Sequence, residues 1–172
     1  MKLDDDHFTL FGLPPRMAQE RSELDARWRQ LQAGAHPDRF VSQGAAAQRV
    51  AMQWAVRINE AHACLKDPLA RAAYLCELRG AAINAERNTA MPRDFLVQQM
   101  QWREALDDAH TLAQVQAIDA DIAASESHLL AQVQGLLDDA QDAPAAAEKV
   151  RALMFVQRFR QDIHARLEAL ET

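Results

Sequence analysis

One tripeptide in this chain combines side chains that acid–base chemistry uses with a break in the backbone: His36-Pro37-Asp38. An imidazole and a carboxylate this close together could serve as a catalytic dyad. The surrounding sequence offers this dyad no Ser or Cys nucleophile and no second histidine at metal-ligand spacing. Pro37 lacks a backbone N–H and pushes the preceding residue out of the helical region. We therefore expect an exposed corner between two helices.

Amphipathic patterns on both sides of the corner predict the helices that position it. Before the corner, Leu24, Trp28 and Leu31 recur at i, i+4 and i+7 and predict a helix over about residues 21–33. Gly34 weakens the last turn of that helix. After the corner, a second helix is predicted over about residues 45–66. A third helix follows, with proline at its first position and a glycine stop near residue 80.

The remainder of the chain predicts three more helices, over about residues 92–109, 112–140 and 144–170. Their short connections favour antiparallel neighbours. Residues 81–91 have no clear period and are interpreted as a linker. We therefore predict an all-α protein with a helical-hairpin domain over residues 1–80, a linker over 81–91 and a three-helix bundle over 92–172.

Composition restricts the class of partner. The net charge of the chain is −6, distributed as +1 over residues 1–91 and −7 over residues 92–172, which argues against nucleic-acid binding. No apolar stretch approaches the roughly 20 residues needed to cross a bilayer, and the acidic N-terminus does not resemble a signal sequence. Cys64 and Cys76 fit no zinc spacing. We expect a soluble, cytoplasmic protein with reduced thiols and no membrane partner.

The first predicted bundle helix has two different faces. At about 100° per residue, Phe95, Trp102 and Leu106 share one stripe and should face the core. Other apolar residues point away from that stripe and lie beside acidic and amide side chains. An exposed apolar patch with a polar rim is typical of a protein-binding site. The predicted patch and rim comprise Leu96, Val97, Met100, Gln101, Glu104 and Asp108.

The sequence downstream of the corner resembles the J-domain family. It reads Ile58-Asn59-Glu60-Ala61 and then Asp67-Pro68, with Arg71 and Tyr74 following. The resemblance implies that the corner and the basic helix before it dock on an ATP-driven chaperone of the DnaK or HscA class and stimulate its ATP hydrolysis. On this resemblance the chaperone-binding residues are His36, Pro37, Asp38, Arg27, Arg29 and Arg39.

Two further strings narrow the resemblance to HscB, the J-type co-chaperone family of iron–sulphur cluster assembly. They are residues 6–14, which open the chain, and residues 71–80. The resemblance implies that the acidic bundle binds the iron–sulphur cluster scaffold protein. It also adds Phe155 on the last helix to the predicted patch. The expected protein is an adaptor that activates a partner ATPase and has no catalytic residue, metal site or cofactor of its own.

Two alternatives remain open on the sequence. The chain could be a J-domain co-chaperone for a different client, in which case the patch on the first bundle helix would not bind the scaffold. It could instead be a helical enzyme that uses His36 and Asp38 as a dyad. The sequence shows no second catalytic cluster that would support the enzyme.

Overall fold

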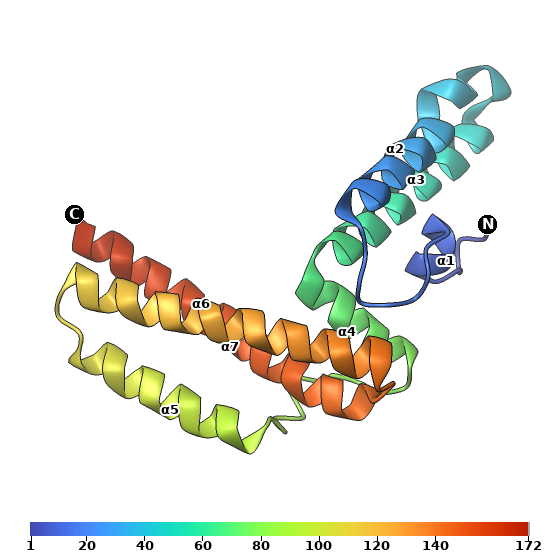
Figure 1. Cartoon of the computed structure of the whole chain (residues 1–172). Helices are drawn as coiled ribbons and strands as arrows, with labels where there is room; N and C mark the ends of the chain where they lie inside the picture. Colours follow the sequence, from blue (N-terminus) through green and yellow to red (C-terminus); the bar gives the residue numbers. More distant parts are fainter. Residues whose placement is uncertain (172) are drawn as a thin grey trace. The chain divides into compact units, whose positions relative to one another are not determined.

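A computed structural model describes residues 1–171 of the chain, and these residues form helices with no strand among them. The prediction of an all-α protein is confirmed (Figure 1). In chain order the elements are α1 (His7–Phe11), α2 (Arg21–Ala35), the 3₁₀ helix η1 (Pro37–Gln43), α3 (Ala45–Lys66), α4 (Pro68–Leu78), α5 (Arg93–Asp108), α6 (Leu112–Gln134), the π-helix η2 (Gly135–Asp139) and α7 (Ala143–Glu171).

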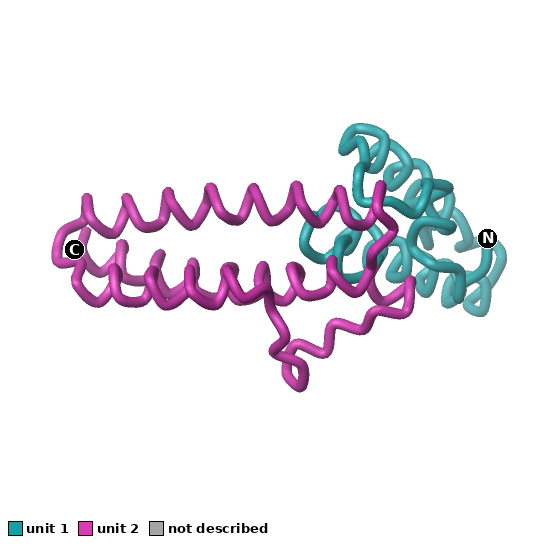
Figure 2. The backbone as a smooth tube through the Cα atoms, turned by 60° about the horizontal axis from the view of Figure 1, so that its bottom comes forward, with its two compact units in different colours: residues 1–75 teal, residues 76–172 magenta. Residues whose placement is uncertain are grey.

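The chain divides into two compact units, Met1–Leu75 and the residues from Cys76 onward (Figure 2). This boundary lies inside α4, a few residues before the predicted end of the first domain at residue 80. The segment 81–91, predicted as a linker, contains no helix, and its Ile83 is buried within the second unit. The predicted bundle extends to Thr172, which lies outside the described residues.

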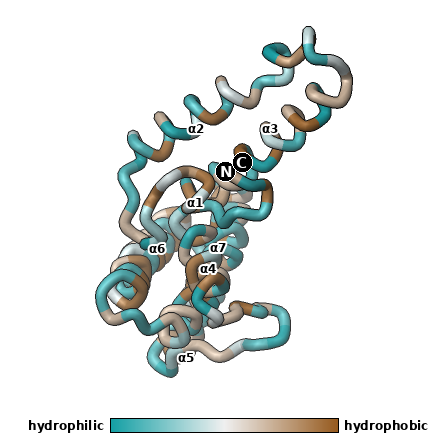
Figure 3. Tube along the Cα trace, turned by 90° about the vertical axis from the view of Figure 1, so that its right-hand side faces the viewer, coloured by the Kyte–Doolittle hydropathy of each residue, from teal (hydrophilic) through white to brown (hydrophobic). Residues whose placement is uncertain are grey.

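In the first unit, α2 and α3 lie side by side as an antiparallel hairpin with the corner at its tip (Figure 1). The helix before the corner continues through Gly34 and ends at Ala35, two residues beyond its predicted end. Apolar and hydrophilic residues are mixed along both helices, as expected for amphipathic helices (Figure 3). The largest fully buried side chains of this unit are Phe8, Leu24, Ile58, Leu65 and Leu75.

A polar and aromatic cluster joins the two helices of the hairpin. The indole of Trp28 stacks on the imidazole of His62 with ring centroids 4.4 Å apart. The other face of the cluster is polar, because His62 Nε2 lies 2.9 Å from Asp25 Oδ1 and the Trp28 N–H donates to Asn59 Oδ1 at 3.0 Å. These contacts tie α2 to α3 and so fix the base of the hairpin that carries the corner.

In the second unit, α6 and α7 pack along their lengths, and their core is aliphatic. Val115, Ile122 and Val133 of α6 and Val150, Val156 and Ile163 of α7 are fully buried. The helix predicted over 112–140 begins as expected, with a capping box between Thr111 and Gln114. It widens at Gly135 into the π-helix, which adds a residue per turn up to Asp139.

Helix α5 joins this pair through two aromatic residues. Phe95 and Trp102 are both buried, and the Trp102 N–H donates to Asp121 Oδ2 of α6 at 2.8 Å. Every helix in residues 1–171 is either too short or too polar to span a lipid bilayer.

Candidate partner-binding sites

The corner is an exposed turn held by its own backbone and side chains. His36, the C-cap residue of α2, has φ −61° and ψ 126°, the extended conformation expected before proline. Pro37 then begins η1, and the Asp38 N–H points to His36 Nδ1 at 3.3 Å. This arrangement engages the imidazole and leaves the Asp38 side chain 87% exposed. The corner therefore presents a carboxylate to solvent at a fixed place.

Arg39, which follows Asp38, stabilises the corner through a hydrogen bond to α2. Its Nη1 donates to the carbonyl of Ala33 at 2.9 Å, which joins η1 to the last turn of α2. That carbonyl is one of the last four of the helix, which have no hydrogen-bond donor within the helix itself. Arg39 was predicted to bind the chaperone, and in this structure its guanidinium also supports the geometry of Asp38.

The two arginines on α2 differ in how they are engaged. Arg27 forms an ion pair with Glu23 at 3.0 Å and donates to the carbonyl of Phe11 at 3.1 Å, so it supports the N-terminal segment. Arg29 is exposed, and within residues 1–171 it has no hydrogen-bond or ion-pair partner. Of these two, Arg29 has the side chain that is available to a partner without breaking an internal contact.

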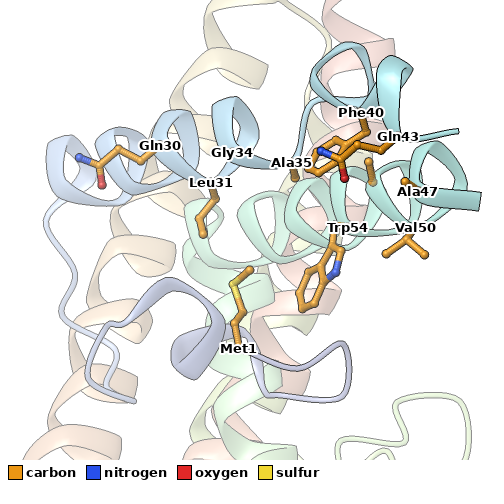
Figure 4. A pocket seen from close by; sticks show the side chains of 11 residues that line it. Met1, Gln30, Leu31, Gly34, Ala35, Phe40, Gln43, Ala47, Val50 and Trp54 are labelled. Atoms are coloured by element: carbon orange, nitrogen blue, oxygen red, sulfur yellow. The ribbon is translucent and has the colours of Figure 1, made fainter.

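An apolar cavity of about 550 Å³ lies beside the corner, between α2 and α3 (Figure 4). Leu31, Gly34 and Ala35 line it from α2, and Val50 and Trp54 line it from α3. A side chain added at Gly34 would meet no atom within 4 Å. The small pair Gly34-Ala35 therefore leaves the end of α2 incompletely packed.

The corner does not have the surroundings of a catalytic dyad. His36 Nδ1 lies 3.6 Å from Asp38 Oδ2, and both side chains are more than half exposed. General acid–base catalysis needs a substrate held within hydrogen-bond reach of the base. The cavity beside the corner is lined mainly by apolar side chains, so it offers few polar groups that could orient a substrate for such chemistry.

The predicted patch on α5 lies on the face opposite its buried residues. The exposed fractions of Leu96, Val97 and Met100 are 40%, 54% and 68%. The rim residues Gln101, Glu104 and Asp108 are exposed as well. The structure therefore exposes three apolar side chains of α5, which we call the strip, together with acidic and amide side chains of the same helix.

Phe155 lies behind the beginning of α5 and is only half-buried. Its ring meets Phe95 edge to face at 5.9 Å and stacks on Phe159 at the same distance. The guanidinium carbon of Arg103 lies 5.3 Å from its centroid. Phe155 therefore contributes partly exposed surface near the patch and also supports the helix that carries the patch.

One residue that holds the second unit together was not singled out by the sequence. Arg151 on α7 is 5% exposed and donates to backbone carbonyls in the segment between α4 and α5. A signal was present, since Arg151 is the one charged residue in the otherwise apolar run from Val150 to Val156. A buried charge of this kind requires partners.

Among residues 1–171, the His, Cys, Asp and Glu side chains form no group of three that could hold a metal ion. Cys64 and Cys76 are unpaired thiols, and burial raises the pKa of each to about 11. Both are therefore protonated at neutral pH and poor nucleophiles.

Comparison with known proteins places both units together in one family. The model of the HSCB C-terminal oligomerisation domain matches residues 91–164. The chain is 48% identical to the co-chaperone protein HscB homolog of Burkholderia multivorans over 174 aligned residues, which cover 100% of this chain and 99% of that protein. It is 49% identical to the homolog of Burkholderia pseudomallei, over 99% of both chains.

Solved structures agree with this relationship. The chaperone HscB from Vibrio cholerae matches with a TM-score of 0.80 and 34% identity, over 96% of this chain and 99% of that one. The human co-chaperone protein HscB matches with a TM-score of 0.87 over 96% of this chain and 84% of that one. At 23% identity, the human protein shows the shared fold alone.

Proposed function

Because the chain belongs to the HscB family of co-chaperones, we propose that it stimulates the ATPase of a DnaK- or HscA-class chaperone and delivers the iron–sulphur cluster scaffold protein to it. In this proposal the chain is an adaptor. The chemistry takes place in the chaperone, and the two units of the chain each bind one partner.

Asp38 supports the chaperone half of the proposal most directly. Its carboxylate is exposed while the backbone beneath it is fixed by Pro37, by the contact to His36 and by the hydrogen bond from Arg39 to α2. A carboxylate held in this way can accept a charge-assisted, bidentate pair of hydrogen bonds from an arginine of the chaperone. His36 and Pro37 fix its position, and Arg29 adds positive charge on α2 that would steer a negatively charged partner.

The exposed strip on α5 supports the scaffold half. Fully burying one side chain of the size of Leu, Val or Met stabilises a complex by about 1.5–3 kcal/mol. Leu96, Val97 and Met100 together with the exposed part of Phe155 therefore suffice for a moderate, reversible contact. Gln101, Glu104 and Asp108 at the rim would select a partner whose surface is basic or rich in hydrogen-bond donors.

The Asp38→Asn variant tests the chaperone half. The steady-state ATPase rate of the purified chaperone is measured as the wild-type chain, the Asp38→Asn variant or an Asp4→Asn control is added. Asp4 is an exposed carboxylate in the same unit, away from the corner. Wild type and the control should accelerate hydrolysis. Because removing one partner of a buried interface pair costs about 2–5 kcal/mol, Asp38→Asn should require at least about thirty times more protein for the same rate. A folded Asp38→Asn variant that stimulates like wild type would rule out the proposed role.

We also propose that the protein acts in the cytoplasm. Its two cysteines are unpaired thiols, Cys76 buried and Cys64 half-buried, which suits a reducing compartment.

A further inference from the structure

Arg151 of α7 gathers three backbone carbonyls from the segment between α4 and α5. Its Nε donates to the carbonyl of Ala90 at 2.7 Å, and its Nη1 donates to those of Ile83 at 3.1 Å and Ala82 at 3.4 Å. The guanidinium is 5% exposed, so these bonds form away from solvent. We call these four groups the Arg151 bridge.

The Arg151 bridge joins the two ends of one loop. Ala82 and Ile83 begin the loop and Ala90 lies near its end, while the loop between them closes on itself through the carbonyl of Asn84, which accepts from the N–H groups of Arg87 and Asn88. Asn84 has a φ of +43°, the left-handed region that asparagine tolerates. A planar guanidinium with donors on several edges can bind carbonyls at both ends of such a loop. A lysine ammonium cannot match the spacing of these carbonyls.

The position of Ala90 links the bridge to α5. Ala90 lies two residues before Pro92, the N-cap residue of α5, and among the described residues this end of α5 receives no side-chain cap. One turn beyond Arg151 on the same helix, Phe155 meets Phe95 in the first turn of α5. Arg151 therefore holds the chain just before α5, and Phe155 holds the helix just after it begins.

We propose that Arg151 is a positioning residue for the exposed strip on α5. Within residues 1–171, its hydrogen bonds go to the loop before α5 and none goes to the strip. By fixing the entry of the chain into α5, it sets the direction in which Leu96, Val97 and Met100 face. This inference rests on the proposed function, because it assigns Arg151 a role in binding the scaffold protein through α5.

A role in binding can be separated from a role in stability alone. The Arg151→Met variant keeps the aliphatic stem and removes all donors, so the three carbonyls lose their partner. Arg158→Met is the matched control, because Arg158 is an exposed arginine of α7 and makes no hydrogen bond within residues 1–171. The full-length proteins are compared by amide hydrogen exchange, by calorimetric titration with the purified scaffold protein and by chaperone ATPase assays with and without the scaffold.

The inference predicts a specific combination of results for Arg151→Met. Exchange of the amides of Arg87, Asn88 and Ala90 accelerates, and scaffold affinity falls by about tenfold to a hundredfold, the cost of a small misplacement. Stimulation of the chaperone without scaffold stays at the wild-type level. With the scaffold protein present, a higher concentration of the Arg151→Met variant is needed for half-maximal stimulation of the chaperone ATPase. The maximal ATPase rate is the same as with wild type. Arg158→Met behaves as wild type in each assay.

Scaffold affinity of Arg151→Met within about twofold of wild type would overturn the inference. If this variant loses helical structure by circular dichroism, Arg151→Lys replaces it, since lysine keeps the charge but reaches only part of the loop. Arg151→Lys should bind the scaffold more weakly than wild type, and equal binding would overturn the inference. A wild-type chain that does not bind the scaffold would instead overturn the proposed function, so the two failures are distinguishable.

Discussion

The imidazole Nδ1 of His7 lies 2.8 Å from Nη1 of Arg57, and this contact joins the start of α1 to the middle of α3. Since the guanidinium can only donate, His7 Nδ1 accepts, and the ring is neutral. The same ring stacks on Tyr74 at 4.1 Å, and its backbone N–H donates to the Tyr74 hydroxyl at 3.0 Å. Arg57 also donates to the carbonyls of Leu3 and Asp5. His7 and Arg57 together hold the N-terminal segment on the hairpin.

Protonation of His7 should destabilise the first unit. Burial, and then the neighbouring charge of Arg57, lower the pKa of His7 from 6.5. In the window between this lowered pKa and 6.5, the unfolded chain binds more protons than the folded one. The contribution of neutral His7 to the free energy of unfolding is therefore complete above about pH 6.5, and it is lost as the pH falls below this value. The thermal midpoint by calorimetry should drop between pH 7.5 and 5.5.

The variant His7→Asn isolates this effect, because an amide oxygen can accept from Arg57 and does not titrate in this range. The drop in midpoint between pH 7.5 and 5.5 should be smaller in His7→Asn than in wild type. His110→Asn, at an exposed histidine of the other unit, should retain the wild-type drop. An equal drop in wild type and His7→Asn would show that His7 does not titrate on unfolding.

Filling the weak end of α2 should stabilise the protein. Gly34 lies inside the helix, and a Cβ there would meet no atom within 4 Å. Gly34→Ala should therefore increase the free energy of unfolding by about 0.5–1 kcal/mol. Gly44→Ala is the contrasting variant, because Gly44 has a φ of +95° and ψ of 170°, a conformation that only glycine adopts readily. Urea unfolding should show a gain for the first variant and a loss for the second. A loss for Gly34→Ala would mean that the turn needs glycine.

Local patterns were sufficient to predict much of this structure. Pro37 stops α2 through its missing N–H and its effect on His36, so the corner follows from three residues. The direction of Val97 and Met100 follows from helical periodicity once Phe95 and Trp102 are assigned to the core. These features depend on neighbours within about two turns along the chain, which a sequence displays directly.

The features that were not predicted depend on residues far apart in sequence. Arg151 binds carbonyls more than sixty residues away, and backbone carbonyls carry no sequence signature. The pairing of His62 with Asp25 needs α2 and α3 already in register. Arg39 was predicted only as a chaperone-binding residue, and its bond to the carbonyl of Ala33 depends on the tight 3₁₀ turn of η1.

An ion pair in the second unit should make its stability sensitive to acid. Arg160 donates to both carboxylate oxygens of Asp119, at 3.0 and 3.2 Å. This bonding, which outweighs the effect of partial burial, lowers the pKa of Asp119. The contribution of ionised Asp119 to the free energy of unfolding is present above about pH 3.9, the pKa of an aspartate in the unfolded chain. It is lost as the pH falls through the lower pKa of Asp119 in the folded protein. Asp119→Asn should therefore be less stable than wild type at pH 7, with a difference that shrinks below about pH 4.

Urea unfolding at pH 7, 5 and 3 measures this difference. Asp162→Asn is the control, because Asp162 is exposed on α7 and makes no ion pair within residues 1–171. It should match wild type at pH 7. A stability difference between Asp119→Asn and wild type that stays constant from pH 7 to pH 3 would contradict the assignment.

Truncating the strip on α5 should weaken scaffold binding specifically. The double variant Val97→Ala/Met100→Ala removes apolar surface worth about 2–4 kcal/mol if both side chains are buried by the partner, or at least about thirtyfold in affinity. Val56→Ala/Met52→Ala is a matched control, because both side chains lie on α3 and are 57% exposed. Calorimetric titration should show the loss only for the first pair. Equal losses for both pairs would mean that the strip is not the binding site.

We propose that one chain both brings the scaffold protein to the chaperone and stimulates the ATPase of that chaperone. The most direct test is the ATPase rate of the chaperone with scaffold alone, with this protein alone and with both. The claim predicts that both together give a rate well above the sum of the separate increments, and that Asp38→Asn abolishes this excess. A rate with both proteins equal to the sum of the separate increments would contradict it.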